Sequence, residues 1–503
     1  MHKIIFTSIL SLLFIACQTP LKQEKEQTIE PFDQLIQLMD QYAVKTLENG
    51  NVNSLALAIY KDGKVYHNYY GEIDPGANNK PNDSTVYELA SISKVFTGSL
   101  VAQAVLEGKL SLSDKIQDYI GQSYTNLAFE GQSITIKHLL THTLGFKDRT
   151  PKGLSEVHNK ISEGYYENNP FEYDFSDLLI ELKTMKLDKK PGTFFEYNSI
   201  GPELLAYVLE LVHERPYKDL LNDFLNERGM NHTSLLDFEN HKNNFAYGYN
   251  ETGKRVPFHK NPLIGGGGGM LSTLPDLIEF MKFQIESDHP IIKESTKELF
   301  RSDDDDVMGY LWQNMGVGEE EGFYYSKTGT SMGTQSGILI CPDSKYGLVL
   351  ISNTTSEDAI DDWMTLFFSK MEVDLIKYPK LNLVSILKPD FIGNTAKGIQ
   401  QFNELRTDTT RYFYSDNELN NLGYELLYEM KDEKKAIQIF KLATEIYPEN
   451  ANLFDSMGEA YFEADDYKNA LINYKKSIGL DSNNSNARKC ILELEQFLIN
   501  GNL

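Results

Sequence analysis

An internal repeat between residues 416 and 484 constrains the fold of this chain more than any other feature of its sequence. Positions of a first copy recur in a second copy at a spacing of 34 or 35 residues. The matched positions are Leu419 and Phe454, Leu422 and Met457, Gly423 and Gly458, Leu426 and Tyr461, Ala436 and Ala470, Phe440 and Tyr474, Ala443 and Ser477, and Pro448 and Ser482. A period of this length predicts paired helices that approach closely at the glycine and stack on their neighbours.

This pattern resembles the tetratricopeptide repeat. The resemblance implies a small all-α domain over residues 416–503, made of two repeats and a capping helix at 485–500. It implies a surface for a peptide or protein partner, but no chemistry of its own. Residues 374–415 are interpreted as a connector, in which Pro379 and Pro389 precede one helix at about 396–406.

The region before the repeats, residues 31–373, mixes strand and helix patterns. Residues 54–60 and 64–70 flank a Lys-Asp-Gly turn, which predicts a β-hairpin. Three more strands are predicted at 322–327, 335–341 and 346–353. Strands at both ends with helices between them predict an α+β fold, in which distant parts of the chain meet in an antiparallel sheet flanked by helices.

The composition limits which partners the protein can bind and which kinds of site can stabilise its fold. The formal net charge is −25, from 73 acidic and 48 basic residues, which argues against a nucleic-acid partner. Beyond Cys17, only Cys341 and Cys490 remain, and they fall in different predicted domains. We therefore expect no disulfide framework, no metal site and no cofactor.

The first 16 residues are interpreted as a lipoprotein signal peptide. The apolar run at 4–15 is too short to cross a bilayer and suits a signal sequence. Its end, Phe-Ile-Ala-Cys at 14–17, resembles a bacterial lipoprotein signal with Cys17 as the lipidated residue. An ordinary secretory signal is the alternative. Residues 17–30 would be a tether, and we expect the protein in the bacterial cell envelope, lipid-anchored and facing the periplasm.

Two motifs carry side chains suited to nucleophilic catalysis. Ser91 and Lys94 stand three residues apart at the start of a predicted helix, hence on one face. A serine becomes a good nucleophile when a neighbouring base takes its proton, and a desolvated lysine can be that base. Tyr197 follows a Pro-Gly turn at 191–192, and its phenol suits a general acid or base.

A third motif lies near the end of the first region. Lys327, Thr328, Gly329 and Thr330 follow one another on a predicted strand. A lysine and a hydroxyl can hold a substrate carboxylate, and the glycine is expected to leave room for substrate against the backbone. Each of the three motifs alone has an ordinary structural explanation. Their combination, in this order and on a helix start, a loop and a strand, does not.

Together the motifs resemble the active-site elements of the penicillin-recognising serine hydrolases, which include class C β-lactamases, DD-peptidases and serine esterases. The flanking segments 134–143 and 265–276 match that superfamily too, and the resemblance spans roughly residues 31–370. It implies that Ser91 is acylated, with Lys94 assisting its deprotonation. Tyr197 would pass a proton to the leaving group and activate the deacylating water. Which of Lys94 and Tyr197 is the base in each step stays open.

The resemblance also implies the substrate-binding residues. Lys327 and Thr328 would hold a carboxylate, and Lys327 would bias Tyr197 electrostatically. The backbone amides of Ser91 and Thr330 would form the oxyanion hole. The superfamily usually has Tyr-Ser-Asn or Tyr-Ala-Asn, whereas residues 197–199 read Tyr-Asn-Ser. Ser199 therefore takes the position of the amide that contacts the acyl side chain, with a shorter reach.

Four other features are interpreted as structural. Ser331 lies in a Gly-x-Ser-x-Gly sequence, but a strand rather than a helix is predicted to follow, which excludes a nucleophile elbow. The glycines at 265–269 lack a phosphate-loop lysine and predict a backbone bend beside the active site. The acidic run at 303–306 lacks calcium-loop spacing. His138 and His142 lack a third metal ligand.

We therefore expect a serine hydrolase that acts through an acyl-enzyme on a small carboxylate-bearing amide, β-lactam, peptide or ester. The alternative is a catalytically degenerate domain that serves, with its repeats, as a binding module for a peptide or a partner protein. In a third arrangement, the repeats dock on the hydrolase domain and restrict access to its cleft.

Overall fold

The computed structural model describes most of the chain between residues 29 and 499. The described ranges are 29–48, 52–167, 169–250, 252–258, 260–303, 306–354 and 364–499. The predicted signal peptide, Cys17 and the tether as far as residue 28 lie outside them. Within these ranges, every helix is too short or too polar to cross a membrane.

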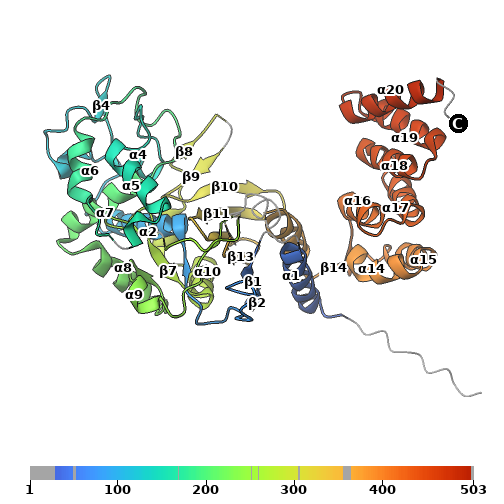
Figure 1. The fold of residues 1–503 in the computed structure, drawn as a ribbon, viewed down its shortest axis with the longest axis horizontal. Helices are drawn as coiled ribbons and strands as arrows, with labels where there is room; N and C mark the ends of the chain where they lie inside the picture. Colours follow the sequence, from blue (N-terminus) through green and yellow to red (C-terminus); the bar gives the residue numbers. More distant parts are fainter. Residues whose placement is uncertain are drawn as a thin grey trace, which may run out of the picture.

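An eight-stranded sheet forms the platform of the larger part of the molecule, in the order β2-β1-β13-β12-β11-β10-β9-β8 (Figure 1). The strands are β1 (Ser54–Lys61), β2 (Lys64–Gly71), β8 (Phe300–Arg301), β9 (Val307–Met308), β10 (Gln313–Gly318), β11 (Gly322–Thr330), β12 (Gln335–Cys341) and β13 (Tyr346–Ser352). β1 pairs antiparallel with β13, with Leu55 opposite Ser352. The predicted α+β fold, with a sheet that joins distant parts of the chain, is confirmed.

The predicted hairpin is present between β1 and β2. Asp62 and Gly63 both have positive φ, 49° and 82°, as a tight two-residue hairpin turn requires. Three strands of this sheet were missed, namely β8, β9 and β10. The first two are only two residues long. β10 contains little apolar sequence, and its pairing with β11 shifts register between Gln313 and Gly316.

Helices cover both faces of the sheet, so every residue of β1 is buried. Ala56 and Ala58 face a cluster with α2 (Ser93–Leu106) and α10 (Leu274–Glu286). Leu55 and Leu57 face the opposite cluster, with α1 (Pro31–Glu48) and a helical turn at Met364–Met371 that continues into α13 (Glu372–Lys377). Because successive strand residues point to opposite faces, such a strand reads as a continuous apolar run.

The remaining helices and short strands of this part form a lobe beside the sheet. Its helices are α3 (Gln117–Ile120), α4 (Ile136–Leu140), α5 (Lys152–Ser162), α6 (Phe175–Leu182), α7 (Ile200–His213), α8 (Tyr217–Asn226), α9 (Phe238–His241) and α11 (Pro290–Ser295). Its short strands are β3 (Tyr87–Glu88), β4 (Ala128–Phe129), β5 (Gln132–Ser133), β6 (Ser234–Leu235) and β7 (Met270–Ser272).

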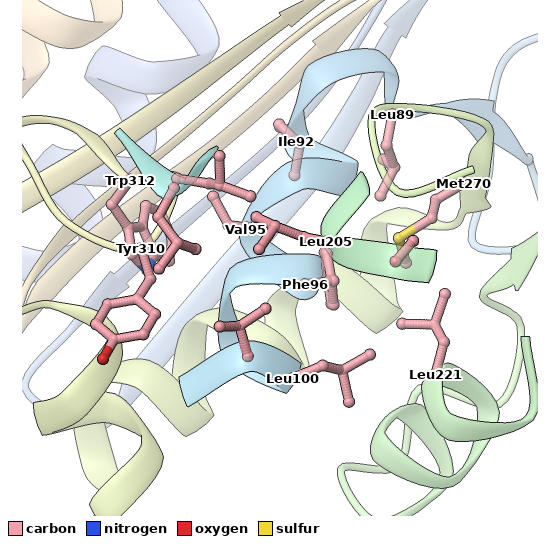
Figure 2. Close-up of a cluster of buried hydrophobic side chains, with 14 of the residues drawn as sticks. Leu89, Ile92, Val95, Phe96, Leu100, Leu205, Leu221, Met270, Tyr310 and Trp312 are labelled. Carbon is pink, nitrogen blue, oxygen red and sulfur yellow. The ribbon is translucent and has the colours of Figure 1, made fainter. Parts of the chain in front are cut away.

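Helix α2 lies at the centre of this part of the molecule. Phe96 is fully buried and stacks on Phe280 with ring centroids 4.4 Å apart. Gly98 lies against the backbone of Tyr310, where a Cβ would stand 2.0 Å from the carbonyl oxygen. Figure 2 shows side chains from several elements around α2, including Leu205, Leu221, Met270 and Trp312. The helix is therefore fixed on all sides, and with it any residue at its N-terminal end.

The repeats form a separate stack of helix pairs (Figure 1). The helices are α16 (Asp416–Tyr424), which continues through a turn at Glu425–Glu429, then α17 (Glu433–Ile446), α18 (Ala451–Glu463), α19 (Tyr467–Leu480) and α20 (Ser485–Ile499). A Cβ at Gly423 would lie 2.5 Å from the Phe440 ring, and one at Gly458 would lie 2.9 Å from the Tyr474 ring. The predicted close approach of paired helices at these glycines is confirmed.

The stretch interpreted as a connector is folded. The predicted helix is α15 (Thr395–Leu405), and a second helix, α14 (Leu383–Gly393), was missed because Pro389 lies inside it. Both helices pack into the same apolar cluster as α16 and α17. Before them, β14 (Leu381–Asn382) pairs with β15 (Tyr412–Phe413). The Gln34 side chain donates to the Asn382 carbonyl (3.0 Å) and accepts from its N–H (2.8 Å), which joins α1 to this helical region.

His138 should contribute to a loss of stability in acid. Its Nδ1 accepts the Thr135 N–H at the start of α4, and burial lowers the pKa of His138 to about 4 from 6.5. Since the folded pKa lies below the unfolded one, the stabilising contribution of the neutral ring is complete above about pH 6.5 and is lost as the pH falls toward about 4. In His138→Gln, which keeps an acceptor at this capping position, the melting temperature should fall less over that range. An identical fall in both proteins would contradict this.

Candidate active site

Ser91 lies in a tight helical turn (Ala90–Ile92) that leads directly into α2. Ala90 has a positive φ of 47°, so the chain bends sharply just before the serine. Ser91 therefore stands one turn ahead of the predicted helix rather than in it. Lys94, in the first turn of α2, is 1% exposed and donates to Ser91 Oγ at 3.1 Å. The two motif residues are in contact, as their spacing predicts.

Tyr197 lies on the other side of the serine. Its Oη donates to Ser91 Oγ at 2.7 Å. The ring also faces cations: Lys94 Nζ is 5.1 Å and Lys327 Nζ 4.8 Å from the ring centroid. Arg149, exposed in the loop before α5, lies 5.8 Å away. The structure thus brings together the four residues on which the predicted site depends, and it adds a guanidinium.

Lys327 is buried within β11, where its Nζ donates to Gln313 Oε1 at 2.5 Å. Burial, with a smaller contribution from the nearby Lys94, holds the pKa of Lys327 well below its ordinary value. Thr328 and Thr330 are exposed on the same strand. Because an ammonium without water needs a polar partner, Gln313 belongs to the site, although no sequence motif marks it.

Gly329 has a different role from the one predicted. A Cβ there would lie 2.4 Å from the Leu89 carbonyl oxygen and 3.0 Å from the Ser91 nitrogen. The space left by the missing side chain is therefore filled by the turn that carries Ser91, not by substrate. Only glycine allows β11 to pass so close to that turn. The strand with Lys327 and the turn with Ser91 are held together in this way.

A cavity of about 320 Å³ opens at the serine. Among the predicted residues, Ser91, Lys94, Ser199 and Thr330 line it. The neighbouring Asn198 is buried instead, where its side chain accepts from Gly201 N–H and donates to the Glu196 carbonyl, both at 2.9 Å. The reversed order of the two residues after Tyr197 thus places a hydroxyl, not an amide, in the cavity wall.

The glycine-rich segment forms a bend beside the serine, as predicted. Gly265 and Gly269 have positive φ, 102° and 98°. The Gly267 carbonyl accepts from Lys94 Nζ at 2.5 Å, so Lys94 has two acceptors. The N–H groups of this segment face the buried carboxylate of Glu203, which the sequence analysis missed. An acidic residue next to the apolar positions of a buried helix is the one signal that pointed to it.

The acidic run at 303–306 lies partly outside the described residues, whereas Ser331 and His142 agree with their interpretation. Ser331 lines the cavity but lies in the turn between β11 and β12, so a strand follows it. His142 is buried with its ring tilted on that of Tyr197, centroids 4.6 Å apart. Burial, together with the charges of Lys327, Lys94 and Arg149, lowers the pKa of His142 well below its ordinary value. It packs as a neutral ring against the phenol.

Comparisons with known proteins agree with this geometry. The β-lactamase family model matches residues 32–368, and the tetratricopeptide repeat model matches 419–450 and 451–484. Protein flp of Staphylococcus aureus (strain N315) is 28% identical over 331 residues, which cover 64% of this chain and 64% of that protein. The chain therefore spans less than two thirds of that relative. A β-lactamase of Providencia stuartii is 22% identical over 364 residues, or 65% of this chain and 88% of that protein.

Solved structures show the same fold. The β-lactamase/D-alanine carboxypeptidase of Yersinia pestis, complexed with citrate, aligns with a TM-score of 0.59 at 20% identity, covering 69% of this chain and 99% of that one. The octameric penicillin-binding protein homologue of Pyrococcus abyssi aligns with a TM-score of 0.56 at 24% identity, covering 66% of this chain and 77% of that one. This chain, with its serine-hydrolase fold and its C-terminal tetratricopeptide repeats, belongs to the β-lactamase family.

Proposed function

We propose that this protein is a serine hydrolase that works through an acyl-enzyme at Ser91. One observation carries the proposal: Ser91 Oγ lies within hydrogen-bonding distance of both Lys94 Nζ (3.1 Å) and Tyr197 Oη (2.7 Å). A hydroxyl needs a base to become a nucleophile, and a leaving group needs an acid. Two proton-carrying groups on a single hydroxyl can supply both.

In the proposed reaction, Ser91 Oγ attacks the substrate carbonyl carbon and its proton passes to Lys94 or Tyr197. The backbone N–H groups of Ser91 and Thr330 stabilise the developing oxyanion. The carbon–leaving group bond then breaks, and the leaving group takes up the proton. Water attacks the resulting ester in a second cycle and frees the serine. Both residues whose amides form the oxyanion hole line the same cavity, which supports this arrangement.

The cations beside Tyr197 favour a substrate that carries a carboxylate on its leaving-group side. Lys94 and Lys327 are buried there, and Arg149 reaches the same ring from the surface. Thr328 is exposed beside Lys327 and can add a hydroxyl donor. We therefore propose β-lactams, peptides ending in a free carboxylate such as muropeptide termini, and small amides or esters as substrates.

The acyl side of the substrate is expected to be bound less tightly than in penicillin recognition. Asn198 has both ends of its amide engaged inside its own loop. Ser199 lines the cavity and offers one short hydroxyl. We therefore propose that acyl transfer does not depend on an amide in the acyl group, which favours short acyl groups and esters.

We also propose roles for the two ends of the chain. The repeats bind a peptide or protein partner, which their helix-pair stack supports. Cys17 carries a lipid that attaches the protein to the bacterial cell envelope, with the hydrolase facing the periplasm. The apolar run at 4–15, which ends two residues before this cysteine, supports the anchor.

Ser91→Ala should abolish turnover while a neighbouring serine is dispensable. Removal of the nucleophile should lower kcat by on the order of a thousandfold or more, because the proposed acyl-enzyme forms through the Ser91 hydroxyl. Ser331→Ala is the matched control, since Ser331 lines the same cavity but its hydroxyl accepts from the Gly333 N–H in the turn between β11 and β12. Hydrolysis of short esters and labelling by a fluorophosphonate would be measured on both. Retained activity in Ser91→Ala, or its loss in Ser331→Ala, would contradict the assignment.

Arg149→Gln should weaken the binding of carboxylate-bearing substrates selectively. With a charge-assisted contact removed, KM should rise about tenfold for a carboxylate-bearing ester and stay the same for its methyl-ester counterpart. Lys147→Gln removes a positive charge from the same loop at an exposed position and serves as the control. Equal effects of Arg149→Gln on the two substrates would remove this residue from the carboxylate site.

A further inference from the structure

A buried carboxylate, Glu203, lies behind the catalytic lysine and takes no part in the proposed proton transfers. It sits in the first turn of α7 and is only 1% exposed. Its oxygens accept from the N–H groups of Gly265 (2.9 Å), Gly266 (3.3 Å) and Gly267 (3.0 Å) and from the Asn261 side-chain amide (3.0 Å). These donors, together with the N-terminal end of α7, offset the cost of burying the charge.

Carbonyl groups of the same residues face α2. The Gly266 carbonyl accepts from Thr97 Oγ1 at 2.7 Å, and the Gly267 carbonyl accepts from Lys94 Nζ at 2.5 Å. Both acceptors face side chains of one helix, while the N–H groups face the carboxylate on another. Residues 265–267 therefore form a bridge of peptide groups between Glu203 on α7 and Lys94 on α2.

The bridge has no side chains of its own to hold it in place. A Cβ at Gly266 would lie 2.3 Å from the Pro202 carbonyl oxygen, and one at Gly267 would lie 3.2 Å from Glu203 Oε1. The segment must therefore be glycine to lie flat against α7. Since glycine is the most flexible residue, hydrogen bonds must fix its position. On the side away from α2, Glu203 supplies the acceptors for all three N–H groups.

We propose that Glu203 is a positioning residue for the acylation of Ser91: its carboxylate fixes residues 265–267 so that the Gly267 carbonyl holds Lys94 Nζ against Ser91 Oγ. This inference rests on the proposed acyl-transfer function. Glu203 acts through the peptide bridge and touches no reacting atom. The glycine segment at 265–267 thereby links the buried carboxylate of Glu203 to Lys94.

Glu203→Gln tests the proposal in the full chain. The substitution keeps the size of the side chain but points an amide N–H₂ at backbone donors. The rate of Ser91 acylation by a fluorophosphonate should fall about tenfold or more, as expected when a proton-transfer group loses its alignment. The pH dependence of this rate should change as well, because Lys94 Nζ would no longer be held in its native position against Ser91 Oγ.

Glu210→Gln is the matched control. It removes the same charge from the same helix two turns further along, where its carboxylate accepts the Tyr217 N–H (2.8 Å) rather than an N–H of the glycine segment. Hydrogen exchange of the peptide that covers residues 261–270 gives a readout that does not depend on activity. Exchange there should be faster in Glu203→Gln than in Glu210→Gln or the native protein.

The possible outcomes separate the two proposals. If native Ser91 is labelled but Glu203→Gln keeps the native rate and pH profile, the positioning role is wrong and the proposed function stands. If Glu203→Gln only melts at a lower temperature, with unchanged acylation of the folded protein, Glu203 is structural and the inference is again overturned. If native Ser91 is not labelled by any acylating probe, the proposed function fails and the positioning role fails with it.

Discussion

The burial of one ammonium group, that of Lys94, is the constraint on which the rest of this structure depends. A cation removed from water must be matched by acceptors, and Lys94 is 1% exposed with two of them, Ser91 Oγ and the Gly267 carbonyl. Lys94 therefore donates to Ser91 Oγ, because a side chain this deeply buried is removed from solvent. Buried side chains pack around α2 (Figure 2) and hold in place the helix that carries the lysine.

The sheet brings the distant parts of the site to this lysine. Pairing of β1 with β13 closes the fold, and β12 and β11 follow in order, so that Lys327 arrives beside Tyr197 from the far end of the sequence. The absence of a side chain at Gly329 lets β11 lie against the turn of Ser91. Lys94, Lys327 and Arg149 then surround a single phenol, and this arrangement underlies the proposal of an anionic substrate.

The sequence predicted what depends on local pattern and missed what depends on tertiary contact. The hairpin, the strands near 322–353 and the repeats follow from turn chemistry, apolar runs and periodicity. Pro389 hid α14, because a proline inside a helix is tolerated only where packing compensates. Arg149, Gln313 and Glu203 carry no motif, since their roles come from neighbours that are remote in sequence. Gly329 was assigned to substrate, although its space belongs to a turn that only the folded chain brings there.

The most direct test of the central claim is mass spectrometry of the intact protein after mixing with penicillins, D-Ala-D-Ala peptides and short esters, followed by peptide mapping. If Ser91 is the nucleophile, one covalent adduct per chain should form on Ser91 and decay with release of the acid product, at rates that differ among the three classes. A lack of adduct across the whole panel, or an adduct on another residue such as Ser331, would contradict it.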